Sequence, residues 1–163
     1  MKYIFTTLTV ILLFSGCSKQ NAFSKFNMSK EQELSASSIQ SSKVRFNEKI
    51  NGTFSSIYLN EIYPEKYFKN EYFFIYYYLK EKAEIYNPKS FVDTKLTLKL
   101  NSKLPISMKK LSNKNQFSHL VSVDSEWNQY YIATFEKQDV KKLNLVLENP
   151  PYSSAALVYQ KGE

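Results

Sequence analysis

The stretch 72-YFFIYYYL-79 is an unbroken apolar and aromatic run, and it decides the fold. Eight residues is the length of a buried strand and too short for a typical core helix. Successive side chains of a strand point to opposite faces, so both faces of this one are apolar and both need cover. The run therefore predicts a central strand, with one face in a core and the other covered by residues 61–70 or by the N-terminal segment.

Segments with a period of two lie on both sides of this run. They are rich in leucine, β-branched and aromatic residues, and turn-forming residues separate them. From Lys43 onward they cover 44–46, 54–59, 96–100, 104–108, 117–123, 143–147 and 156–159. This pattern predicts one all-β domain over residues 43–163, an immunoglobulin-like or related antiparallel β-sandwich of about 7–9 strands.

Several short signals predict how the strands begin and end. Asn51-Gly52 is either a hairpin turn or a bulge within one long strand. Residues 124–128 form a predicted hairpin loop between two strands, and Pro105 indicates an edge strand, where a missing N–H is tolerated. Asn149-Pro150-Pro151 stops the strand before it.

The segment 17–42 is rich in serine and is predicted to be a tether. Ser29 and Gln32 have the spacing of a capping box, in which each side chain bonds the other residue's backbone N–H. A short helix is therefore expected within the tether.

Residues 1–16 have the layout of a secretory signal: a lysine, an apolar stretch and small residues. The apolar stretch is shorter than the roughly 20 residues of a membrane-spanning helix. Ser15-Gly16-Cys17 resembles the lipobox of bacterial lipoproteins, although Phe14 stands where that family usually has leucine. The open alternative is an ordinary secretory signal with an incidental cysteine.

The lipobox resemblance implies cleavage before Cys17 and a covalent lipid on that cysteine, with no other cofactor. Several acyl chains on one residue hold a protein at a membrane stably. Among such lipoproteins an aspartate after the cysteine often signals inner-membrane retention, and this chain has Ser18. The expected location is therefore the outer membrane, with the domain facing the periplasm or the surface.

The amino-acid composition excludes several kinds of functional site. Cys17 and His119 are the only residues of their types, so disulfides within the chain and histidine-rich metal sites are ruled out. No nucleophile elbow or phosphate-binding glycine loop is present, and no metal site or catalytic residue is assigned. His119 is in phase with the apolar residues of 117–123 and is expected on a half-buried strand face. The net charge of +7 comes from scattered lysines, and nucleic acid is not an expected partner in the envelope.

A second hypothesis gives the aromatic residues a function. Tyrosine combines a flat apolar ring with a polar tip, which suits sugars, peptides or partner proteins. Trp127 is expected to pack on the core, with an exposed binding anchor as the alternative. The candidate binding residues are Tyr63, Tyr67, Tyr72, Tyr76, Tyr78 and Trp127.

The body of the domain also resembles small uncharacterised lipoproteins of AT-rich Gram-negative bacteria, through residues 127–132, a strand at Phe135 and the segment 155–160. That resemblance implies no activity. The favoured function is a non-enzymatic, lipid-anchored β-sandwich that binds a protein or other partner in the envelope. The alternative is an envelope hydrolase or carbohydrate-binding enzyme subunit that uses a tyrosine-rich groove with Glu61, Glu65 or Asp124.

Overall fold

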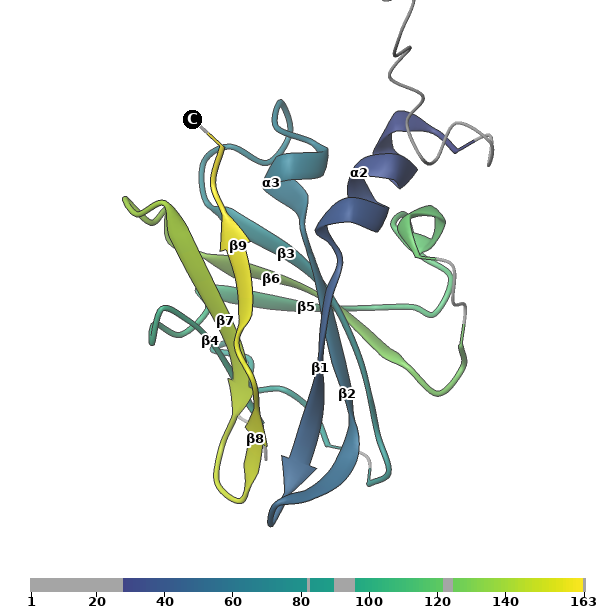
Figure 1. The fold of residues 1–163 in the computed structure, drawn as a ribbon, viewed down its shortest axis with the longest axis vertical. Coiled ribbons are helices and arrows are strands. Elements are labelled where there is room, and N and C mark those ends of the chain that lie inside the picture. The colour runs from purple at the N-terminus through teal and green to yellow at the C-terminus, as the bar shows by residue number, and fades with distance from the viewer. Residues whose placement is uncertain (1–27, 82, 90–95, 122–124, 163) are drawn as a thin grey trace, which may run out of the picture.

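The protein folds as an all-β sandwich, as the period-two segments predict. The computed structural model describes residues 28–81, 83–89, 96–121 and 125–162, so Cys17, the signal segment and Asp124 lie outside the described residues. One sheet has the strand order β5-β6-β3-β2-β1-β8 and the other β4-β7-β9, and every pair of neighbours is antiparallel. Figure 1 shows the two sheets as layers, with the helices α2 and α3 gathered at one end.

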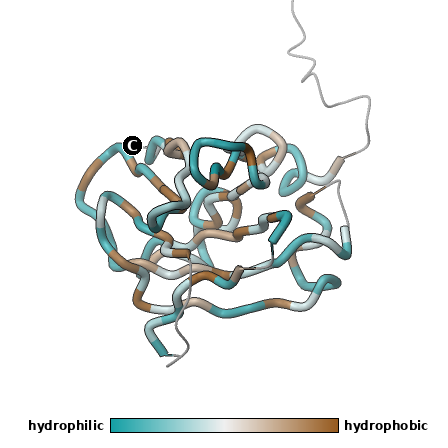
Figure 2. Tube along the Cα trace, turned by 90° about the horizontal axis from the view of Figure 1, so that it is seen from below, coloured by the Kyte–Doolittle hydropathy of each residue, from teal (hydrophilic) through white to brown (hydrophobic). Residues whose placement is uncertain are grey.

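The strands are β1 (Gln40–Phe46), β2 (Lys49–Tyr58), β3 (Glu71–Leu79), β4 (Thr97–Leu100), β5 (Ser107–Leu111), β6 (Gln129–Phe135), β7 (Lys142–Glu148), β8 (Tyr152–Ser154) and β9 (Leu157–Gln160). The helical elements are α2 (Lys30–Ser38), α3 (Leu59–Ile62) and the 3₁₀ helix η2 (Ser118–Leu120). Figure 2 shows hydrophobic and hydrophilic residues interspersed along the chain.

Strand β3 has the central position that its two apolar faces predict. It lies between β2 and β6 in the larger sheet. Its odd-numbered residues from Phe73 to Leu79 face the smaller sheet and join the main core. From that sheet the alternating leucines of β4 and β7 contribute fully buried side chains to the same core: Leu98, Leu100, Leu143, Leu145 and Leu147.

The other face of β3 is covered by short helices and the loops beside them. Phe74 is fully buried in a second cluster with residues of α3, Phe117 and Leu120. Leu34 of α2 packs against the edge of this cluster. Helical elements therefore provide the cover that the sequence assigned to residues 61–70 or the tether.

The predicted capping box forms at the start of α2. Gln32 N–H donates to Ser29 Oγ at 3.3 Å, and Ser29 N–H donates to Gln32 Oε1 at 2.8 Å. The buried Ser35 hydroxyl donates to Leu120 C=O at 2.7 Å and attaches α2 to η2. Strand β1 begins at Gln40, directly after this helix and before the predicted domain start at Lys43.

Of the two interpretations of Asn51-Gly52, the bulge is confirmed. The β1–β2 turn lies at Asn47-Glu48, where both residues have positive φ, and the β1–β2 register shifts opposite Asn51. Gly52 lies so close to β3 that an added Cβ would come 1.9 Å from Tyr78 C=O. Glycine is required there by a close backbone approach and not by a turn.

Two predicted strands are wrong in part. Residues 118–120 form η2, because Asn115 Oδ1 accepts from Phe117 N–H at 2.9 Å and Ser118 Oγ accepts from Asn115 N–H at 3.0 Å. Such local side-chain bonds compete with a strand ladder. Among the described residues 117–121 there is no strand, so the strand expected on this side of the predicted hairpin loop is wrong over that range.

The segment around Pro105 also differs from its prediction. The chain turns at Asn101-Ser102, both with positive φ, and β5 begins only at Ser107, so Leu104 and Ile106 are exposed. Pro105 itself lies in no strand, but β5, which begins two residues later, is at the edge of the larger sheet among the described strands.

The two sheets are connected at the C-terminal strands. Strand β7 ends at Glu148, and Asn149 and Tyr152 bond to each other across Pro150-Pro151, as the strand stop predicts. Strand β8 then joins β1 in the larger sheet, and β9 joins β7 in the smaller one. The Gln40 amide bonds both Val158 N–H and Val158 C=O, so a side chain of β1 occupies the free edge of β9.

Candidate binding cleft

The six candidate binding residues do not gather on one open face. Tyr67 is 8% exposed and packs on Tyr72, with ring centroids 4.9 Å apart. Tyr72 and Tyr76 are half-buried at the edge of the helix-covered cluster, as is Tyr63. Four of the six therefore belong to the cover of β3.

The remaining two residues meet elsewhere. Tyr78 is 38% exposed and Trp127 is 77% exposed, and together they line a surface depression with Ser125 and Asn128. The expectation that Trp127 packs on the core is wrong, because the side chain is exposed and belongs to neither core cluster of the described residues. The alternative interpretation, an exposed aromatic side chain, matches its position.

This depression continues into a cleft of about 490 Å³. One wall is the end of β3, and the opposite wall is the turn before β6. Charged side chains from β5 and from the segment after β3 complete the lining, which consists of Tyr78, Leu79, Lys80, Glu84, Lys110, Asn113, Glu126, Trp127, Asn128 and Gln129. A few hundred cubic ångströms is the usual size of a small-ligand site.

The cleft exists because β3 is longer than its neighbour β6. The pairing of β3 with β6 ends at Tyr77 opposite Gln129, whereas the pairing with β2 continues to Leu79 opposite Gly52. Tyr130 O–H donates to Ser125 C=O at 3.3 Å, which holds the turn in its position away from β3. The larger sheet therefore has a gap between the end of β3 and the turn before β6.

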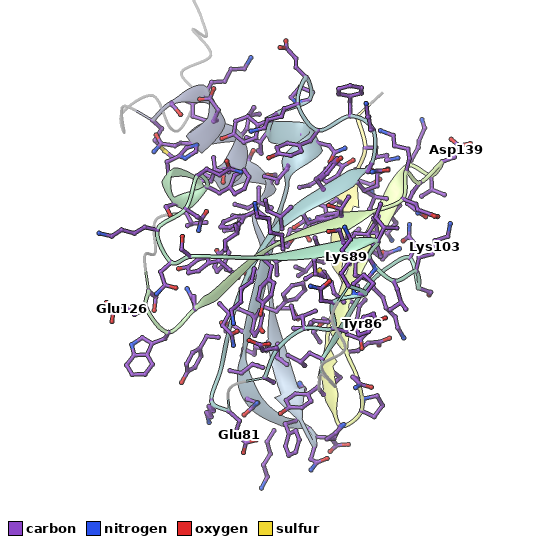
Figure 3. The ribbon with its side chains drawn as sticks, turned by 180° about the vertical axis from the view of Figure 1, so that it is seen from behind. Glu81, Tyr86, Lys89, Lys103, Glu126 and Asp139 are labelled. Atoms are coloured by element: carbon purple, nitrogen blue, oxygen red, sulfur yellow. The ribbon has the colours of Figure 1, made fainter. Side chains whose placement is uncertain are left out.

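The charges at the cleft are exposed. Lys110 Nζ lies 2.6 Å from Glu84 Oε1, and both side chains are more than half exposed, so the pair adds little stability. The hydrogen bond from Lys110 to Glu84 raises the pKa of Lys110. Lys110 also lies over the Tyr131 ring, with its Nζ 6.0 Å from the ring centroid. Figure 3 shows Glu126 projecting from one side of the molecule, opposite Lys103 and Asp139.

A second cavity, of about 600 Å³, lies at the α3 end. Its lining includes Tyr58, Glu61, Phe68, Lys137 and Lys161. Burial raises the pKa of Glu61. Of the carboxylates considered for a hydrolase, Glu61 lies in this lining, Glu65 does not, and Asp124 lies outside the described residues.

Beneath this cavity, a buried carboxylate holds the C-terminal segment. Glu71 is fully buried and lies 2.7 Å from Lys161 Nζ. It accepts from Tyr58 O–H at 2.5 Å and from Gln138 N–H at 2.9 Å. Burial would raise the pKa of Glu71, but the Lys161 ammonium and these hydrogen bonds outweigh it and hold that pKa below its ordinary value. All these bonds are internal to the fold, so we assign the cluster to stability.

His119 does not lie on a strand face. It is exposed on η2, and its Nε2 lies 2.8 Å from the Tyr63 hydroxyl. The half-buried position expected from its phase is wrong, because the segment is helical. His119 is not part of the cleft lining.

Over the described ranges, no three His, Cys, Asp or Glu side chains are grouped so that they could hold a metal ion. Within the same ranges, no helix has the length and apolar character needed to cross a membrane.

Comparison with protein-family models, curated proteins and solved structures gives no match. The cleft is therefore interpreted from its geometry.

Sequence reasoning missed most of the cleft residues. Lys80 was visible as a basic residue flanking the aromatic run, but Glu84 and Lys110 are 26 residues apart and nothing local links them. The best signal was the turn-forming segment around Trp127, because a large aromatic residue within a polar turn has little backbone nearby to cover it.

Proposed function

We propose that this protein is a non-enzymatic envelope protein, anchored by a lipid on Cys17 in the outer membrane, and that its β-sandwich binds an envelope partner in the Tyr78–Trp127 cleft. The observation that carries the proposal is the 77% exposure of Trp127 at the rim of a cleft. Exposed tryptophan is characteristic of binding anchors, since burial of its large ring on association contributes much of the affinity.

The position of the cleft supports this arrangement. The described chain begins at Met28, beside α2 and at the end of the molecule that carries α3. Strand β3 starts near α3 and ends at the cleft. The residues between Cys17 and Met28 can span at most about 40 Å. A lipid on Cys17 therefore keeps the α3 end near the membrane. The cleft, at the other end of β3, then stays accessible to a partner.

The chemistry of the cleft favours binding over catalysis. His119, the only histidine of the chain, lies outside its lining. Glu84 is ion-paired with Lys110 across the surface. The remaining lining groups are aromatic rings, Leu79, side-chain amides and exposed charges, which suit recognition.

The anchor is tested with Cys17→Ala. The wild-type protein should incorporate labelled palmitate and fractionate with the outer membrane, and the variant should lose both properties. Palmitate labelling that survives the substitution would refute the anchor.

The cleft is tested in cells with a photo-crosslinking amino acid at position 126, in the exposed part of the cleft lining that leaves Trp127 in place, and with the same amino acid at the exposed Phe68 as control. We expect a discrete adduct from position 126 that Trp127→Ala or Tyr78→Ala weakens. Adducts of equal yield from positions 126 and 68, or none from position 126, would refute the cleft as the binding site.

A further inference from the structure

Resting on the proposed function, we infer the class of partner: the cleft binds an extended peptide segment, which adds as a short strand along the edge of β3 at Leu79. The inference comes from the backbone of β3, whereas the proposed function comes from the side chains. The inference specifies that main-chain hydrogen bonds hold the ligand in the gap between Leu79 and the turn before β6. The residues on the two faces of the sheet beside this gap then select the ligand's side chains.

The direction of the backbone groups follows from the strand register. In an antiparallel ladder, the N–H and C=O of one residue point to one neighbouring strand and those of the next residue point to the other. Lys80 N–H donates to Asn51 C=O at 2.9 Å, so even-numbered residues of β3 bond β2. The odd-numbered residues therefore direct their N–H and C=O toward the β6 side.

Leu79 is the odd-numbered residue beyond the end of β6. The last pair between β3 and β6 is Tyr77 with Gln129, and the register places no β6 residue opposite Leu79. Leu79 instead lines the cleft, with Trp127 and Asn128 on the far wall. Its N–H and C=O thus point into a gap in the sheet, which is the setting in which a peptide strand is added.

The gap at Leu79 is bordered by different residues on the two faces of the sheet. Tyr78 lies on the helix-covered face of β3, because it follows Phe74 and Tyr76 in phase. Lys110 lies on the opposite face, where it pairs with Tyr131 in the ladder and lies over its ring. Alternate side chains of an added strand would contact the aromatic pair Tyr78 and Trp127 on one face and the ion pair Lys110–Glu84 on the other. The expected ligand sequence therefore alternates an apolar or aromatic residue with a charged one.

A peptide explains the open backbone better than a sugar does. A glycan could stack on Trp127 and bond the amides of the lining without using Leu79. Only a ligand with its own alternating N–H and C=O groups matches the edge of a strand.

The test uses the full-length protein in detergent micelles and a phage-displayed library of random heptapeptides. Enriched peptides are synthesised and titrated against the fluorescence of Trp127, which is the only tryptophan of the chain. N-methylation of the one peptide amide that donates to Leu79 C=O should weaken binding about tenfold, whereas N-methylation of the amides on either side of it should change binding little, because only the lost strand bond leaves a group unpaired. Peptide binding should also slow hydrogen exchange of the Leu79 amide.

Two variants and one competing ligand make the outcomes distinct. Trp127→Ala should fail to enrich the same peptides, whereas Phe68→Ala, which removes an exposed ring at the other end, should enrich them normally. The inference is overturned if no peptide is enriched above the Trp127→Ala background, or if N-methylation at no single position weakens binding more than at its neighbours. If a peptidoglycan glycan fragment changes Trp127 fluorescence and peptides do not, the peptide is refuted while the binding cleft stands. If neither ligand acts and position 126 gives no crosslink, both proposals fail.

Discussion

The two faces of β3 are almost equally aromatic, yet they are covered in different ways. Toward the smaller sheet, Phe73, Ile75, Tyr77 and Leu79 are all buried. Toward the helices, Phe74 is fully buried, Tyr72 and Tyr76 on either side of it are half-buried, and Tyr78 at the end of the strand is exposed.

The difference shows that a sheet and short helices cover a strand differently. The main core, to which β4, β7 and β9 contribute, buries the inner face of β3 from Phe73 to Leu79. The elements α2, α3 and η2 cover the outer face only near its beginning. The candidate cleft lies where the helical cover has ended and β6 has not begun.

The largest expected effect comes from Phe74→Ala, which tests whether the helical cover is as well packed as the sandwich core. Loss of a fully buried phenylalanine costs about 3–5 kcal/mol. We expect urea denaturation to give similar losses for Phe74→Ala and Phe73→Ala. A much smaller loss for Phe74→Ala would show that the cover is loose. Phe74→Leu and Phe73→Leu provide the same comparison if the alanine variants do not fold.

Lys161→Met tests the charged end of the inner face. It leaves Glu71 buried without its ammonium partner, at a cost of about 3 kcal/mol, near the lower end for a broken buried pair because Lys161 is 19% exposed. The control is Lys99→Met, which breaks the exposed pair with Glu148 and should cost less than about 1 kcal/mol. Equal losses in the two variants would contradict the assigned role of Glu71.

The same cluster predicts a pH dependence. The pKa of Glu71 is lowered in the folded state, so its contribution is fully present above the pKa of an unfolded glutamate, about 4.3, and is lost as the pH falls below that value. The free energy of unfolding should therefore decrease more steeply below pH about 5 in the wild type than in Glu71→Gln. Parallel pH profiles would mean that Glu71 does not contribute in this way.

Ser35→Ala tests how the helical cover is attached. It removes the buried hydroxyl bond to Leu120 C=O and should lower stability by about 1–2 kcal/mol. On the same helix, the exposed Ser37 bonds only its neighbour Leu34, so Ser37→Ala should stay within about 0.5 kcal/mol. A stability loss at Ser37 equal to that at Ser35 would disprove the attachment.

The smallest effect on stability is expected from Trp127→Ala, within about 0.5 kcal/mol, because the ring is mostly exposed. In the wild type, Trp127 fluorescence should be quenched by acrylamide almost as efficiently as that of free tryptophan. Strong protection from the quencher in the absence of a ligand would show that Trp127 is covered.

The sequence predicted the features that depend on local pattern. Alternating leucines mark β4 and β7 because one face of each strand meets the core. The spacing of Ser29 and Gln32 marks α2 because a capping box needs only one helical turn. The central position of β3 followed from its two apolar faces.

Alternation alone did not predict η2 around His119, because local bonds from the side chains of Asn115 and Ser118 to the backbone override the strand pattern there. Features that depend on distant residues could not be predicted either. The role of Gly52 is visible only beside Tyr78, its neighbour across the ladder. The alternation of 104–108 gave no indication that the chain was still turning between the two sheets.

The sequence by itself determined the fold class, because residue type and a period of two are properties of neighbouring residues. It also supplied the expectation of a lipid at Cys17. Only the tertiary structure decided which aromatic residues are exposed, because exposure depends on where β6 and the short helices end relative to β3. The cleft between Leu79 and Trp127 results from that mismatch in length, which no single segment of the sequence contains.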